Sequence, residues 1–71
     1  MTTKPIELST QTITMREPKV RDLMAVDNID GEAKKEVALL SSLTQMTEEE
    51  LLDLSLKDYG KLQTQMKAFL A

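Results

Sequence analysis

The residues of this chain that could take part in chemistry are a few serines and several carboxylate residues, by their side chains, and two glycines, by their backbone. A serine becomes a nucleophile when a base takes its proton, but the sequence contains no histidine and no cysteine. No serine is followed three residues later by lysine, the spacing of serine–lysine hydrolases. With glycine only at Gly31 and Gly60, no glycine-rich phosphate loop can form. We therefore predict that the chain is not an enzyme and uses no cofactor.

Carboxylates could instead bind a metal ion, and the segment Asp27–Gly31 has the composition of a calcium loop. When its glycine is aligned with the invariant glycine of such a loop, the first and last ligand positions fall on Val26 and Val37. Valine cannot ligate calcium, so we interpret Asp30 as the residue that caps the following helix. The run Glu48–Glu50 does not converge on one ion either, because successive helical residues point about 100° apart. The sequence therefore predicts no metal site.

The charge of the chain is unevenly distributed along its 71 residues. Residues 1–21 carry four basic and two acidic side chains, whereas residues 22–71 carry five basic and ten acidic ones. An acidic body argues against nucleic acid as a partner, since contacts with phosphates supply most of that affinity. No apolar run approaches the ~20 residues that span a bilayer, so we expect no membrane partner. The lack of cysteine fits the reducing cytoplasm, where we place the chain.

The elements that position these side chains begin with a short β-arm, residues 1–16. Within residues 5–15, apolar residues alternate with polar ones and β-branched residues are frequent, as is typical of strands. The polar triplet Ser9–Gln11 lies between two alternating stretches and predicts a turn. A single hairpin is only marginally stable in water, so it should pack on helices or pair with a strand of another chain.

The remaining residues, 17–71, have the pattern of a helical body that forms one domain with the arm. Pro18 interrupts the strand pattern and favours a helix over about 19–26. The apolar residues on one face of this helix are Val20, Leu23 and Met24. Further helices are expected over about 31–45, 48–54 and 56–70. The predicted fold class is mainly α: a small bundle of three to four helices with a short N-terminal β-arm or hairpin.

The last helix is the most clearly amphipathic part of the chain. Its apolar stripe holds both aromatic residues and consists of Tyr59, Leu62, Met66, Phe69 and Leu70. Two helix starts precede the stripe, because Thr47 with Glu50 and Ser55 with Asp58 have the spacing of capping boxes. Gly60, near the start of this helix, costs about 1 kcal/mol relative to alanine; close approach by another backbone would explain it, and simple tolerance is the alternative.

The second helix, 31–45, carries more apolar surface than a helix packed on one side requires. Its apolar sector is roughly 180° wide, whereas one-sided packing needs about 100°. One explanation is a central position with neighbours on two sides, and the other is a spare stripe that binds another chain. Methionine is flexible and suits such adaptable surfaces. On the second explanation, we predict partner-binding residues Leu39, Leu43, Met46 and Met66, with a role in the core as the alternative.

Five short motifs succeed one another along the chain. They are Arg16-Glu17-Pro18, Arg21-Asp22-Leu23, Val37–Leu40, Met46–Leu51 and Asp58–Gln63. In this order, and in a chain of this size, they resemble the phage tail assembly chaperone family, the group that contains the small tail protein E of contractile-tailed phages and prophages. The resemblance covers nearly the whole chain, with little contribution from residues 1–15.

The resemblance implies a non-enzymatic assembly factor in the host bacterial cytoplasm. It implies that the protein binds the long tape measure protein, keeps it soluble until the tail tube assembles, and is absent from the finished virion. The family has no catalytic residues to transfer to this sequence. Its matched positions have structural interpretations: Pro18, Asp22, Leu23, Tyr59, Gly60 and Leu62. The expected partner is therefore the phage tape measure protein, and the marginal size of the chain also allows a homo-oligomer.

Two other functions fit the same residues. A small regulatory adaptor, such as an antitoxin or a transcription-associated factor, would use the two helices of Pro18–Leu43 as a helix-turn-helix. The second of these helices has only Lys34 and Lys35 as basic residues, which is few for contact with DNA. A structural tail component would instead remain in the particle. The sequence leaves these alternatives open.

Overall fold

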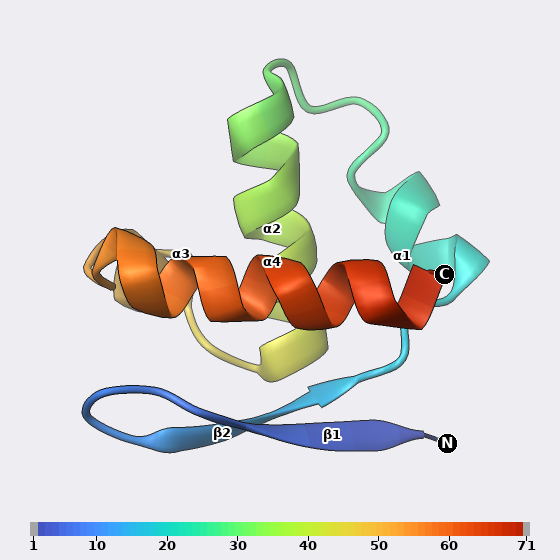
Figure 1. Cartoon of the computed structure of the whole chain (residues 1–71). Helices are drawn as coiled ribbons and strands as arrows, with labels where there is room; N and C mark the ends of the chain where they lie inside the picture. The colour runs from blue at the N-terminus through green and yellow to red at the C-terminus, as the bar shows by residue number, and fades with distance from the viewer. Residues whose placement is uncertain (1, 71) are drawn as a thin grey trace.

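The computed structural model describes residues 2–70, which form a two-stranded hairpin followed by four helices (Figure 1). The strands are β1 (Thr3–Glu7) and β2 (Thr12–Arg16), and the helices are α1 (Val20–Ala25), α2 (Glu32–Thr44), α3 (Glu48–Leu52) and α4 (Leu56–Leu70). The predicted fold class, mainly α with a short N-terminal hairpin, is confirmed. None of the helices in residues 2–70 is both long and apolar enough to cross a lipid bilayer.

The hairpin has one apolar face, as the alternating sequence predicts. β1 and β2 pair antiparallel, with Ile6 opposite Ile13. Residues two apart in a strand share a face, so the buried side chains fall on the side that meets the helices. These side chains are Ile6, Leu8, Ile13 and Met15.

The predicted turn lies between Leu8 and Gln11, where the Leu8 N–H donates to the Gln11 carbonyl at 2.7 Å. Tight two-residue hairpin turns favour positive φ, but neither Ser9 nor Thr10 adopts it. The turn is held from outside by Asp58 at the start of α4. The Asp58 carboxylate accepts hydrogen bonds from the Ser9 backbone N–H at 3.2 Å and from the Ser9 hydroxyl at 3.0 Å.

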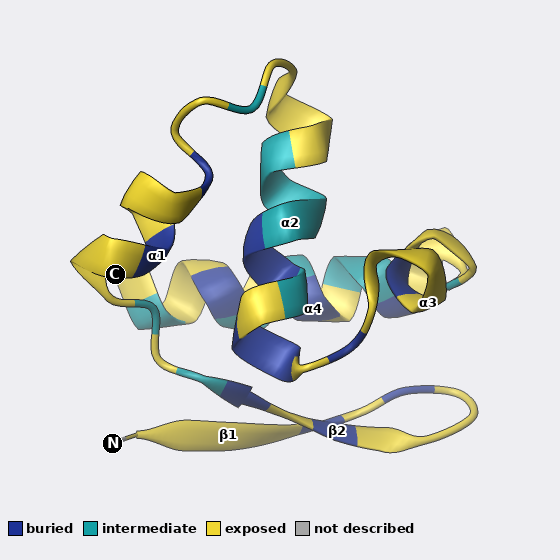
Figure 2. Ribbon diagram, turned by 180° about the vertical axis from the view of Figure 1, so that it is seen from behind, coloured by how far each residue is buried: buried dark blue, intermediate teal, exposed yellow. Residues whose placement is uncertain are grey.

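The core lies where the hairpin, α2, α3 and α4 meet. The hairpin runs beneath the helices, and α4 crosses the C-terminal half of α2 (Figure 1). Each of these elements contributes a side chain with almost no exposed surface: Met15, Leu40, Leu51 and Leu62. Burial in α2 is concentrated in its C-terminal half (Figure 2). The C-terminal part of the wide apolar sector of α2, with Leu39, Leu40 and Leu43, is thus explained by a central position in the fold.

Two of the predicted helix starts have the expected caps. The Thr47 hydroxyl accepts from the Glu50 N–H, and the Glu50 carboxylate accepts from the Thr47 N–H at 2.8 Å. The Ser55 hydroxyl accepts from the Asp58 N–H at 3.1 Å. The Asp58 carboxylate does not complete a capping box, because it is engaged by Ser9.

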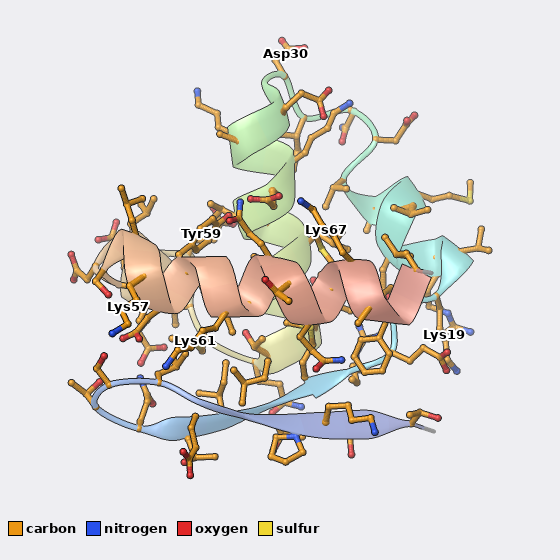
Figure 3. The ribbon with its side chains drawn as sticks, in the orientation of Figure 1. Lys19, Asp30, Lys57, Tyr59, Lys61 and Lys67 are labelled. Atoms are coloured by element: carbon orange, nitrogen blue, oxygen red, sulfur yellow. The ribbon has the colours of Figure 1, made fainter. Side chains whose placement is uncertain are left out.

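The predicted cap at Asp30 is wrong. The N-cap of α2 is Gly31, which has φ of 96° and accepts no side-chain cap bond. A positive φ is accessible to glycine without a steric penalty, so the backbone turns into α2 at Gly31. The Gly31 carbonyl then accepts the first helical bond from the Lys35 N–H. The Asp30 side chain points away from the body of the molecule, at the far end of α2 (Figure 3).

Two further expectations differ from the structure. The shared apolar face of α1 is exposed rather than packed, with Val20 73% and Met24 72% exposed, whereas Asp22 is buried. An ion pair with Arg16 explains why the polar residue takes the inner position. At Gly60, a Cβ atom would meet nothing within 4 Å among the described residues, so no neighbouring backbone requires glycine there.

Candidate protein-binding surface

The four residues predicted to bind a partner are all buried. Leu39 and Met66 line one groove together with Leu23, and Leu43 and Met46 line a second groove beside β2. The structure therefore separates them into two pairs rather than one continuous patch. In this conformation they belong to the core, so contact with a partner would require the helices to move apart. Their role in binding stays a prediction.

Large apolar side chains are instead exposed where α3 ends and α4 begins. Leu52 is 65% exposed and Leu56 is 88% exposed. Two adjoining grooves of about 380 and 460 Å³ share Ala33, Val37 and Leu52 in their linings. Some of the residues that line these grooves are apolar and at least partly exposed. We call this set of residues the α2–α3–α4 surface. It consists of Ile29, Ala33, Val37, Ala38, Leu52, Leu54 and Leu56.

The short helix α3 explains why Leu52 faces outward. Its capping box begins the helix after Thr47, and the buried Leu51 anchors it to the core. The next residue in a helix points about 100° away, so Leu52 turns toward solvent when Leu51 turns inward. The serine cap at Ser55 then begins α4 in a new direction, which leaves Leu56 exposed in its first turn.

A polar cluster borders the surface where α4 crosses α2. The Tyr59 hydroxyl and the Gln63 side-chain amide both donate to Glu36 Oε1 at 2.8 Å. Burial of Tyr59, together with its hydrogen bond to Glu36, raises the pKa of the phenol above its ordinary value. Tyr59 therefore stays neutral and links the two helices (Figure 3). This cluster fixes the crossing of α2 and α4, and with it the shape of the groove.

The charges around the surface are mainly acidic. Glu48 and Lys34 both line one of the grooves, and Glu36 lines the other. Glu49 and Asp53 are exposed nearby on α3 and at its end. The last turn of α3 contains no basic residue. An apolar surface with an acidic border suits a partner that combines apolar and basic side chains.

The exposed side chains of this surface are suited to contact with another protein. Within residues 2–70, no group of three or more acidic side chains is placed to hold a metal ion. Every buried side-chain nitrogen or oxygen in the described part of the chain has a hydrogen-bond partner. An exposed patch of leucines is typical of an interaction site.

Neither Leu52 nor Leu56 was predicted to bind a partner. One signal was present, because Leu56 lies off the apolar stripe of the last helix and has no place in a one-sided helix. Leu51 and Leu52 are also consecutive, so a helix cannot bury both on one face. The direction in which α3 presents them depends on tertiary packing and could not be derived from spacing.

Together, the fold and this surface are those of a small, helix-rich protein with an exposed apolar area. The chain belongs to the phage tail assembly chaperone family. The sequence model described as phage tail assembly chaperone proteins, E, or 41 or 14, matches residues 7–71, which include all of β2 and the four helices. No curated protein and no solved structure matches the chain. The resemblance of the five motifs to this family is confirmed.

Proposed function

We propose that this protein binds the tape measure protein of its phage and keeps it soluble until the tail tube assembles. It acts by protein–protein contact in the host cytoplasm and leaves before the virion is complete. Membership of the tail assembly chaperone family supports the general role. A holding chaperone needs an apolar surface that is open before its client arrives, because binding the unassembled client shifts the equilibrium away from aggregation.

The observation that carries the proposal is the exposure of Leu52 and Leu56 beside two grooves. Isolated leucines on a surface are ordinary, but these two adjoin Val37, Ala38 and Leu54 in one apolar area. An amphipathic client helix could place its apolar stripe along this area and its basic residues beside Glu48 and Glu49.

The test is co-expression of the chain with its tape measure protein, with and without substitutions at the surface. We expect Leu52→Gln with Leu56→Gln to move most of the client from the soluble to the insoluble fraction. Both leucines are exposed and glutamine is a good helix former, so the fold should persist. Circular dichroism of the variant checks this point.

The matched control is Leu70→Gln, which alters an exposed leucine at the other end of α4. It should leave the client as soluble as the wild type does. Equal client solubility with the wild-type chain and with no chain at all would rule out the proposed function. If the double variant solubilises the client as well as the wild type does, the client binds at a surface other than Leu52 and Leu56.

The two alternative functions make different predictions. A helix-turn-helix would need α2 to enter a DNA groove, but Leu39, Leu40 and Leu43 hold its C-terminal half in the core. This burial favours the chaperone over the regulatory adaptor. A structural tail component would be found at stoichiometric level by mass spectrometry of purified particles, whereas the chaperone should be absent from them.

A further inference from the structure

The hairpin of residues 2–70 has two outer edges, and they are not equivalent. The Leu8 N–H bonds to the Gln11 carbonyl, and the Glu17 N–H bonds to the Thr2 carbonyl. Hydrogen-bonded pairs alternate with non-hydrogen-bonded pairs along an antiparallel ladder. Counting from these two hydrogen-bonded pairs, every second pair between them has its backbone N–H and C=O groups pointing outward. On β1, the outward residues are Thr3, Pro5 and Glu7, and on β2 they are Thr12, Thr14 and Arg16.

The β1 edge is blocked against another strand. Pro5 lies at its centre and has no N–H to donate. The Glu7 carbonyl already accepts a hydrogen bond from Lys61 Nζ at 3.1 Å. Lys61 reaches toward the hairpin from α4 (Figure 3). A proline and a lysine are common means by which proteins prevent pairing at an edge.

The β2 edge has no such protection. Among the described residues, the sheet has only two strands, and no bond from another element reaches the backbone N–H groups of Thr12, Thr14 or Arg16. Thr12 and Thr14 are exposed and β-branched, which suits strand pairing. Beside this edge lies an open groove of about 470 Å³ lined by Thr14, Met46 and Glu50 among others.

We propose that β2 pairs antiparallel with β2 of a second copy of this chain, with the two Thr14 residues facing each other at a two-fold axis. This register places Thr12 opposite Arg16 of the second copy and forms about six backbone hydrogen bonds. Two hairpins thereby become one four-stranded sheet, which removes the open edge from each copy.

The sequence of β2 fits a second copy because the pairing is self-complementary. Ile13 lies opposite Met15 of the second copy on the apolar face, and threonine meets threonine on the outer face. No two like charges are directly opposite. Arg16 is already paired with Asp22 at 2.6 Å, so the sheet does not bring together unneutralised cations. An unrelated strand would need to match all of these positions independently.

Disulfide formation between single cysteines tests the register, since the chain has no native cysteine. In the proposed pairing, the two Thr14 Cα atoms lie about 5.5 Å apart, within disulfide range. The two Thr12 Cα atoms are offset by four residues, about 14 Å along the strands, which is too far. We expect Thr14→Cys to form covalent dimers roughly ten-fold more than Thr12→Cys under mild oxidation. Equal cross-linking of the two variants would overturn the register.

Light scattering on the full chain tests whether pairing depends on the β2 edge. The wild type should have twice the 8.0 kDa chain mass at high concentration. Thr14→Pro removes an outward N–H without removing a bond inside the hairpin, and it should be monomeric. Its matched control, Thr14→Val, keeps the N–H and should remain dimeric. A monomeric wild type throughout a wide concentration series, or a Thr14→Pro variant that is folded and still dimeric, contradicts the proposal. If Thr14→Pro does not fold, the cysteine pair decides.

Discussion

The helices α1 and α4 are both amphipathic, but only α4 buries its apolar side. In α4, Leu62 is fully buried and Met66 nearly so. In α1, Val20 and Met24 are exposed, while the charged residue Asp22 is buried. Each helix also contains one buried aspartate, Asp58 in α4 and Asp22 in α1, so a buried carboxylate alone does not distinguish them.

The difference between the two helices lies in their attachment. The Arg16 guanidinium donates to both carboxylate oxygens of Asp22, at 2.6 and 2.8 Å. The Lys19 backbone N–H donates to the same carboxylate at 2.8 Å. An ion pair of this kind attaches a helix at one side chain and does not itself give the other side chains of the helix packing contacts. Apolar packing, as in α4, instead occupies a whole side of the helix.

The largest effect should come from the packed helix. Leu62→Ala removes a fully buried side chain from α4 and leaves a cavity in the hydrophobic core that also contains Met15, Leu40 and Leu51. We expect the free energy of unfolding to fall by about 3 kcal/mol, measured by urea denaturation followed by circular dichroism. Leu70→Ala, in the same helix but exposed, should change it by less than about 0.5 kcal/mol. Similar losses for the two variants would mean that α4 is not anchored through Leu62.

A smaller effect should come from the ion pair that attaches α1. Hydrogen bonding to Arg16 lowers the pKa of Asp22 from 3.8 to about 2, with a further contribution from the Lys19 N–H. A carboxylate with a lowered pKa stabilises the fold above its ordinary pKa, and this stabilisation is lost as the pH falls through 3.8 toward about 2. We expect Asp22→Asn to lower the free energy of unfolding by about 2 kcal/mol at pH 7.

The pH dependence separates this ion pair from a simple packing defect. The difference between wild type and Asp22→Asn should shrink as denaturation is repeated at lower pH, because the wild type then loses the same charge. Asp53→Asn, which alters an exposed carboxylate, serves as the control and should show little difference at any pH. A difference between wild type and Asp22→Asn that is constant with pH would contradict the role of the Asp22 charge.

The smallest effect should come from the exposed side of α1. Leu23→Gln with Met24→Gln replaces two exposed apolar residues by a good helix former. The free energy of unfolding should change by less than about 0.5 kcal/mol, as measured by the same denaturation. A loss comparable to that of Leu62→Ala would show that α1 packs its apolar side after all, and would remove the contrast between the two helices.

Features that depend on neighbouring residues could be predicted from the sequence. The hairpin follows from alternation over residues 5–15, and the capping box at Thr47 and Glu50 needs only a three-residue spacing. The stripe of α4 was predicted because its members recur with the helical period, and Leu62 and Met66 are buried, but Leu70 at the end of the helix is 62% exposed. Asp30 was assigned wrongly as a cap, because the adjacent Gly31 adopts a positive φ and begins the helix itself.

Features that depend on contacts between elements could not be predicted in this way. The inward position of Asp22 follows from Arg16, which precedes the break at Pro18. Leu23 matches the family pattern and was interpreted as structural, but it is exposed. The candidate surface is a further case, since the exposure of Leu52 and Leu56 depends on how α3 turns against α2.

The contact between Ser9 and Asp58 joins residues 49 positions apart in the sequence. During translation, at about 5–20 residues per second, roughly 2–10 s pass between the synthesis of the two residues. The hairpin turn is therefore synthesised well before the helix that holds it. Until α4 is made, the apolar face of the hairpin lacks the packing contacts that α4 supplies. The hairpin is synthesised before every helix, but it can dock on α4 only after nearly the whole chain has been made.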